Sequence, residues 1–125
     1  MKNSEITAAF INLGNIINQN EKLPVRLSYA ITRNIRALEP LNKAFEEERN
    51  KLLDMYNVKD ADGRPEYVKT NKIEIAEEYK AAWEKEIREL LNIDTEFKPH
   101  RIHPSDLPEN IEPGVLLALD FMIID

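Results

Sequence analysis

The sequence predicts a mainly α-helical protein, folded as an elongated antiparallel helical hairpin braced by an N-terminal helix and a C-terminal segment. Three observations support this fold class. Apolar side chains recur every three or four residues in three segments, which is the period of one face of an α-helix. Turn-forming residues at 59–65 separate the two longest segments, and proline is concentrated after residue 98. The fold class also allows for a short two-stranded β element beside the helices.

The first helix is expected to begin near the N-terminus, with Asn3 or Ser4 as its cap. Such a side chain can accept a hydrogen bond from a backbone N–H that the first helical turn leaves free. The apolar face of this helix follows spacings of four, three and four through Ile6, Phe10, Leu13 and Ile17. The polar residues 18–22 are expected to end it.

The second helix is expected to begin at Pro24, because proline lacks the backbone N–H that has no partner in a first helical turn. Its apolar stripe consists of Leu27, Ile31, Ile35, Leu38, Phe45, Leu52 and Tyr56. Pro40 interrupts this stripe, so we expect a kink or a break between two helices there. A continuous helix over residues 24–57 would be about 50 Å long, which indicates an elongated hairpin.

Residues 59–65 predict a strong turn, because Gly63 favours positive φ, aspartate bonds its own backbone and Pro65 stops regular structure. A third helix is expected over residues 72–92, with Thr70 or Asn71 as its cap. Its apolar face comprises Ile75, Tyr79, Ala82, Trp83, Ile87, Leu90 and Leu91. Glu and Lys are frequent on its other faces.

Four prolines between residues 99 and 113 exclude a long helix from that part of the chain. Residues 95–103 are predicted to form a short extended segment, paired with residues 66–69. Pro113 is expected to open a last short helix. The buried side of this helix is expected to hold Val115, Leu116, Leu119, Met122 and Ile123. The Phe-Met-Ile-Ile sequence at 121–124 is too apolar to lie in water, so the C-terminus should dock on the core.

Length and composition predict one domain over residues 1–125. The absence of cysteine excludes disulfides and thiol chemistry and is compatible with a reducing compartment. The N-terminus has no basic-then-apolar leader, and no apolar run approaches the roughly 20 residues that span a bilayer. We therefore expect a soluble cytoplasmic protein that makes no membrane contact.

The motifs that carry enzyme or metal chemistry do not fit this sequence. An EF-hand register at the 60–63 turn would put Val58 and Lys69 where calcium needs carboxylates. His100 and His103 stand between prolines, and no cysteine or acidic cluster completes a metal site. There is no glycine-rich phosphate loop and no nucleophile elbow. We expect a protein that is not an enzyme and has no cofactor or metal.

Charge is distributed unevenly along the chain, whose net charge is −6. Residues 1–43 hold six basic and three acidic side chains, whereas residues 44–96 hold nine basic and fifteen acidic ones. The acidic total disfavours binding to nucleic acid in general, because the protein as a whole repels phosphates.

Arg26, Arg33 and Arg36 form the first candidate interaction site, since Arg26 and Arg33 are seven residues apart and share one helical face. Lys22 and Lys43 extend this basic patch. A helix that binds a nucleic-acid groove can have this pattern. The favoured interpretation is that the arginine stems cover apolar surface and their charges pair with the acidic third helix.

Glu46, Glu47 and Glu48 form the second candidate interaction site. Consecutive residues of a helix point in different directions, so these carboxylates cannot converge on one substrate. A solvated face that contacts a partner is the better interpretation.

One stretch of the sequence resembles a known family. Residues 23–65 contain Leu-Pro-Val-Arg-Leu-Ser-Tyr-Ala-Ile-Thr-Arg, then the acidic Phe-Glu-Glu-Glu-Arg, then Lys-Asp-Ala-Asp-Gly-Arg-Pro, and Leu-Ala-Leu-Asp-Phe-Met-Ile follows near the C-terminus. This order is similar to a family of small uncharacterised proteins encoded by phages and prophages of Gram-positive bacteria. The resemblance implies a helical hairpin with a short C-terminal appendage and a viral gene, and it supplies no catalytic residues.

The leading hypothesis is a non-enzymatic protein–protein interaction module of a phage or prophage, acting in virion assembly or in control of a host protein. A homodimer is also considered, because surplus apolar surface could serve a second copy. One alternative is an anti-defence inhibitor of a CRISPR or restriction nuclease, acting by binding or by acidic mimicry of nucleic acid. Another is a nucleic-acid-binding accessory protein that uses the three arginines.

Overall fold

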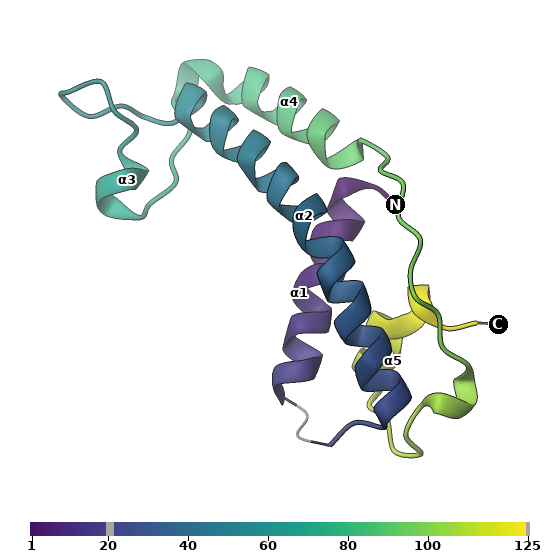
Figure 1. Ribbon diagram of the computed structural model, residues 1–125. Coiled ribbons are helices and arrows are strands. Elements are labelled where there is room, and N and C mark those ends of the chain that lie inside the picture. Colours follow the sequence, from purple (N-terminus) through teal and green to yellow (C-terminus); the bar gives the residue numbers. More distant parts are fainter. Residues whose placement is uncertain (20–21, 125) are drawn as a thin grey trace.

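The structure is a computed structural model that describes residues 1–19 and 22–124, and its architecture confirms the predicted mainly α-helical hairpin (Figure 1). The long helix α2 (Val25–Tyr56) and helix α4 (Lys80–Asn92) run antiparallel and form the hairpin. Helix α1 (Asn3–Gln19) packs along the first half of α2. Helix α5 (Pro113–Leu119) and the C-terminal chain pack at the end of the molecule opposite the hairpin turn.

The N-terminal cap of α1 differs from the expectation. The carbonyl of Lys2 accepts from the backbone N–H of Ile6 at 3.0 Å, and the Glu5 carboxylate accepts from the backbone N–H of Lys2 at 3.0 Å. Lys2 therefore takes the cap position, and Asn3 lies inside the helix with a buried side chain. The prediction of Asn3 or Ser4 as the cap is wrong. Residues 20 and 21 of the polar cluster expected to end α1 lie outside the described residues.

Helix α2 runs without a break through Pro40 for 32 residues, about 48 Å. The alternative of two separate helices is wrong. Leu38 and Phe45 lie on either side of the proline, and both are buried on the same face of α2. Their packing offsets the roughly 3 kcal/mol that a proline costs inside a helix. Pro24 is the residue before the helix, and its carbonyl accepts from the backbone N–H of Ser28 at 2.9 Å.

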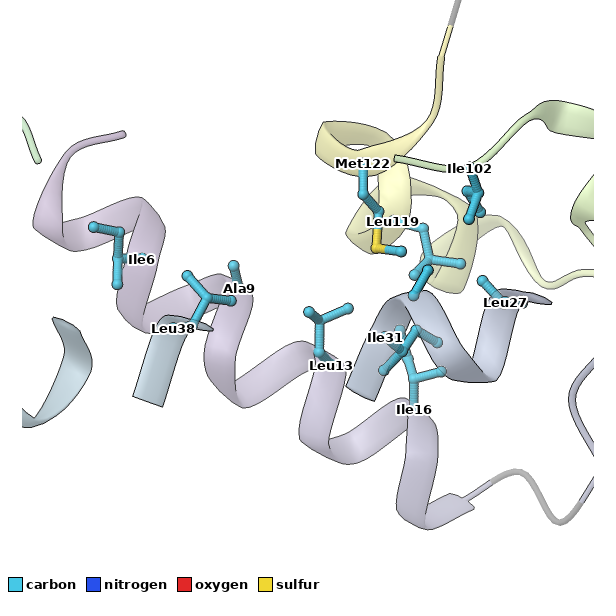
Figure 2. Packing of buried hydrophobic residues seen from close by; sticks show 11 residues of the cluster. Ile6, Ala9, Leu13, Ile16, Leu27, Ile31, Leu38, Ile102, Leu119 and Met122 are labelled. Carbon is cyan, nitrogen blue, oxygen red and sulfur yellow. The ribbon is translucent and has the colours of Figure 1, made fainter. Parts of the chain in front are cut away.

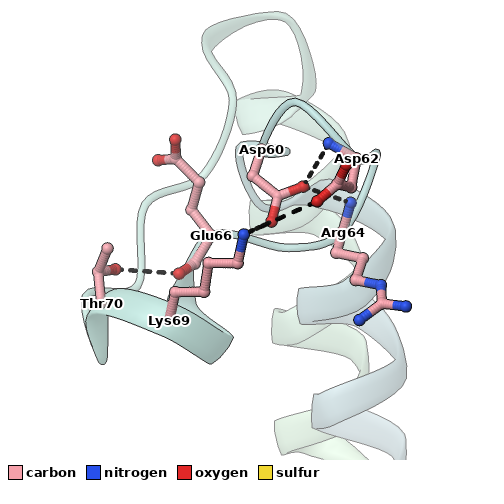
Figure 3. Close-up of polar contacts among 6 residues, drawn as sticks. All are labelled: Asp60, Asp62, Arg64, Glu66, Lys69 and Thr70. Atoms are coloured by element: carbon pink, nitrogen blue, oxygen red, sulfur yellow. Dashed lines mark hydrogen bonds and ion pairs between the residues drawn. The ribbon is translucent and has the colours of Figure 1, made fainter.

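The predicted turn at 59–65 is present. The Asp60 side chain accepts from the backbone N–H groups of Asp62 and Arg64 at 2.9 and 3.0 Å (Figure 3). Gly63 has a φ of +77°, the left-handed region in which glycine is favoured. The short helix α3 (Tyr67–Thr70) follows, and it ends at Asn71 in the left-handed conformation.

The third predicted helix begins later than expected, because residues 74–76 pair with the end of α2. The carbonyl of Glu74 accepts from Val58 at 2.8 Å, and the carbonyl of Tyr56 accepts from Ala76 at 2.9 Å. A short 3-10 helix, η1 (Glu77–Tyr79), then leads into α4. Thr70 and Asn71 end a helix rather than cap the next one, so that part of the prediction is wrong.

Residues 95–103 contain no helix, in agreement with the prediction, but their expected partner is wrong because residues 67–70 are the helix α3. Within the described residues the β pairing consists of isolated bridges rather than a two-stranded element. These bridges are Lys2 with Asp94, Asn57 with Ile75, Lys59 with Pro65, and Ile102 with Ile123. The segment that runs back from α4 is therefore held by the two chain ends.

The C-terminal segment docks on the core as predicted. After the 3-10 helix η2 (Pro104–Asp106), Pro113 opens α5, and the 3-10 helix η3 (Asp120–Met122) follows. Leu119 and Met122 are fully buried, whereas Leu116, expected on the buried side, is 40% exposed.

The hydrophobic core lies at one end of the molecule, between α1, the first half of α2 and the C-terminal segment (Figure 2). Its buried residues are Ile6, Ala9, Leu13, Ile16, Leu27, Ala30, Ile31, Leu38, Ile102, Leu119 and Met122. The remaining half of α2, residues 58–79 and α4 form what we call the distal arm. From residue 58 to residue 89 no side chain is fully buried. Among the described residues, no helix combines the length and apolarity needed to cross a membrane.

Candidate functional site

The three arginines predicted as an interaction site all lie on α2, and all three are exposed. Arg26 forms an ion pair with Asp106, with 3.7 Å between Nη1 and Oδ1. Within the described part of the chain, Arg33 and Arg36 form no ion pair. The expected pairing with the acidic third helix is not found, because α4 lies along the other half of α2 (Figure 1).

The three consecutive glutamates are exposed and point in different directions, as predicted. The Glu46 carboxylate accepts from the Asn42 side-chain amide at 3.3 Å. Glu48 pairs with Lys51 at 2.8 Å, and this hydrogen bond raises the pKa of Lys51. The glutamates therefore form no joint carboxylate site, which is consistent with a solvated face.

Several acidic residues of the distal arm form ion pairs with basic ones. Lys80 pairs with Glu77 at 2.7 Å, and Lys69 lies 3.3 Å from Asp60 and 3.9 Å from Asp62 (Figure 3). Two backbone N–H groups and this lysine lower the pKa of Asp60, and the hydrogen bond to Arg64 contributes most. These contacts replace a hydrophobic core in holding the turn at the tip.

Among the described residues, four asparagines are buried, and each connects a helix to another segment. Only Asn3 had an expected role, as a helix cap. The side-chain amide of Asn34 donates to the carbonyl of His100 at 3.0 Å, and its oxygen accepts from the N–H of His100 at 2.7 Å. A side-chain amide carries the same donor and acceptor as a peptide group. Asn34 therefore fixes the extended segment 95–103 against α2 as a neighbouring strand would.

The other three asparagines act in the same way. Asn3 donates to the carbonyl of Leu90 at 2.9 Å, which joins α1 to the end of α4. Asn42 accepts from the Thr7 hydroxyl at 3.0 Å, which joins α2 to α1. Asn57 accepts from the N–H of Glu74 at 2.8 Å, which closes the tip. Asn34, Asn42 and Asn57 lie on or near the apolar stripe of α2. An asparagine within an apolar stripe is the feature of the sequence that could have indicated these buried side chains.

The distal arm also carries large apolar side chains that face solvent. They are Met55, Val68, Ile73 and Tyr79, with exposed fractions of 57%, 65%, 60% and 42%. The ring of Tyr79 contacts that of Tyr56, with 5.5 Å between their centroids. A hydrogen bond to the Glu86 carboxylate raises the pKa of Tyr56. The arm thus combines exposed apolar groups with dense surface charge.

Metal and small-molecule sites have little support in the geometry. Within residues 1–19 and 22–124, no group of three or more His, Asp or Glu side chains is arranged to hold a metal ion. A cavity of about 240 Å³ lies between the end of α1, the start of α2 and residues 108–115. It is smaller than the roughly 300–1,000 Å³ of common ligand pockets. A second hollow, of about 330 Å³ beside Phe10, Asn42 and Glu46, is a more open depression of the surface.

The fold and these surfaces define a mainly α-helical protein with one hydrophobic core and one projecting two-helix arm. Comparison with protein-family models, with curated proteins and with solved structures gave no match.

Proposed function

We propose that this chain is a non-enzymatic protein–protein interaction module of a phage or prophage, acting in virion assembly or in control of a host protein. The observation that carries the proposal is the distal arm. It projects from the core, contains no fully buried side chain between residues 58 and 89, and exposes four large apolar side chains.

Exposed apolar groups of this kind are a physical argument for a partner. Transfer of apolar surface out of water is favourable by roughly 25 cal/mol per Å². Protein interfaces are enriched in aromatic residues and methionine at their centres and have a polar rim. Met55 and Tyr79 supply such groups, and the charged residues 59–69 supply such a rim. The phage origin is supported by the motif order over residues 23–65.

The proposal is tested by a tagged pull-down from bacterial host lysate, with and without nuclease, read by mass spectrometry. We expect a stoichiometric protein partner that survives nuclease treatment. The double variant Val68→Ser/Ile73→Ser should reduce its recovery about tenfold, because it removes the two most exposed large apolar side chains of the arm.

The matched control is Ile11→Ser/Leu117→Ser, which removes two apolar side chains of similar exposure away from the arm. It should leave recovery unchanged. The identity of the partner distinguishes assembly from host control, and a host nuclease would indicate the anti-defence alternative. Recovery of nucleic acid alone, or of no partner, would contradict the proposal.

A further inference from the structure

Besides its apolar stripe, α2 carries a regularly spaced row of side chains on the face turned away from the core. It consists of Arg26, Tyr29, Arg33, Arg36, Pro40 and Lys43, all of them exposed. Their spacings are three, four, three, four and three, which is the repeat of residues that face a partner helix in a coiled coil. We call this set the basic seam. It spans about 26 Å of helix.

The chemistry of the basic seam is unlike that of an ordinary solvated face. Four of its six members are basic and none is acidic, and only at the next position of the repeat, Glu47, does the charge change sign. Asp106 pairs with Arg26, while Arg33, Arg36 and Lys43 form no ion pair in the described part of the chain. The seam therefore presents three basic side chains without an ion-pair partner among the described residues, at a helix-packing spacing.

An aromatic anchor lies within this charge. Tyr29 is 57% exposed, and the ring of His100 holds it edge-on at a centroid distance of 5.5 Å. Tyrosine and arginine are the residue types that most often dominate the energy of protein interfaces.

The seam is also rigid before any partner arrives. The opposite face of α2 carries Leu27, Ile31 and Leu38 into the core, and Asn34 holds the segment beside it. A surface ordered in advance loses less conformational entropy on binding.

From this spacing and charge we propose that the basic seam binds an acidic amphipathic helix of a protein partner. The partner helix presents carboxylates at the same three-four repeat, with an apolar side chain over Tyr29 and Pro40. The inference rests on the proposed protein-binding function and adds the surface and the chemistry of the partner.

A protein helix fits this surface better than a nucleic acid. A continuous phosphate backbone would meet the carboxylates of Glu39, Glu47 and Asp106 at the borders of the seam. An acidic helix can place carboxylates only opposite the basic positions. The alternating three- and four-residue spacing, a repeat of seven, is also the spacing of side chains that face another helix. Binding of a nucleotide chain does not require that spacing.

The test measures binding of a fluorescein-labelled helical peptide of about 20 residues with Glu and Leu at the three-four repeat positions. Fluorescence anisotropy is recorded with the full chain at about 50 mM and about 500 mM salt. Three further probes are a peptide of the same composition in shuffled order, a peptide with Lys for each Glu, and a single-stranded oligonucleotide of about 20 nucleotides.

We expect saturable binding of the acidic peptide that weakens at high salt, and at least about tenfold weaker binding of the shuffled peptide. Arg33→Glu/Arg36→Glu should weaken binding more than about tenfold, and Tyr29→Ala several-fold. The control Arg64→Glu/Lys72→Glu makes the same charge change at the exposed tip and should have little effect. All these substitutions are at exposed positions, and circular dichroism verifies that each variant is folded.

The inference is overturned by any of three results: no saturable binding, equal binding of the shuffled peptide, or equal loss in the control variant. Tighter binding of the oligonucleotide that depends on Arg33 and Arg36 would also overturn it, in favour of a phosphate-binding surface. The pull-down with the arm variants is independent of this measurement. A partner recovered through the arm without peptide binding would reject the basic seam alone.

Discussion

Single buried asparagines connect the parts of this molecule that helix packing leaves separate. Asn34 is fully buried, and both ends of its amide bond the backbone of His100, which lies 66 residues away in sequence. Its amide also lies 3.4 Å from the sulfur of Met122, in the C-terminal segment. One side chain therefore orders two segments that have few backbone hydrogen bonds of their own.

Asn34→Ala should lower the free energy of unfolding by about 2–3 kcal/mol, because it leaves the N–H and carbonyl of His100 without their partner. Asn50→Ala, at an exposed position of the same helix, is the control and should stay within about 0.5 kcal/mol. Urea denaturation followed by circular dichroism measures both. Equal effects of the two substitutions would show that the Asn34 bonds contribute nothing net.

At the scale of elements, helix α2 dominates the architecture, because both the core and the distal arm are built on it. Pro40 lies near its middle and is exposed, so its ring avoids the core. The proline still lacks the N–H that would bond to the carbonyl of Arg36 in a regular helix. Tertiary packing on both sides therefore sustains a helix that local propensity disfavours.

Pro40→Ala should raise the free energy of unfolding by about 1–2 kcal/mol, since it restores a backbone donor and a good helix former. Part of the gain is offset by the greater freedom of the unfolded chain. Ala44→Pro places a proline at another exposed position of α2 and should lower stability by about 3 kcal/mol. If Pro40→Ala were destabilising in thermal and urea unfolding, the proline would have to contribute to packing.

The whole molecule divides into an end with a hydrophobic core and a distal arm with almost none. α1, the first half of α2 and the C-terminal segment supply that core, and the chain ends close it. The arm is stabilised by turn hydrogen bonds, surface ion pairs and a few side chains such as Phe45 and Leu53. Surface ion pairs contribute little individually, so stability should be concentrated at the core end.

Met122→Ala should therefore lower the free energy of unfolding by about 2–4 kcal/mol, because it opens a cavity where α1, α2 and the C-terminus meet. Leu117→Ala is the matched control in the same segment, since Leu117 is 78% exposed, and it should change stability by less than about 0.5 kcal/mol. Chemical denaturation of both variants provides the measurement. A small effect of Met122→Ala would contradict docking of the C-terminal segment on the core.

For the candidate surfaces, the sequence indicated which charged residues are exposed but not which of them act together. The spacing of Arg26, Arg33 and Arg36 is visible in the sequence. The spacing also puts Tyr29 on the same helical face. That this face points outward, and that α4 does not cover it, follows only from the packing of α1 and the C-terminal segment on the opposite side. The exposed apolar groups of the arm were missed because a predicted apolar face, such as that of Tyr79, was assumed to be buried.

The sequence by itself determined what depends on local periodicity and local turn chemistry: the stripes of α1 and α2, the turn at Asp60 and Gly63, and the helix that Pro113 opens. The tertiary structure alone decided where α4 begins, what the extended segment 95–103 packs against, and whether α2 continues through Pro40. Those features depend on hydrogen bonds between residues 17, 66 and 87 positions apart and on burial of side chains from three elements in one core. Contacts at such separations leave no periodic trace in the sequence, because each one depends on where the rest of the chain lies.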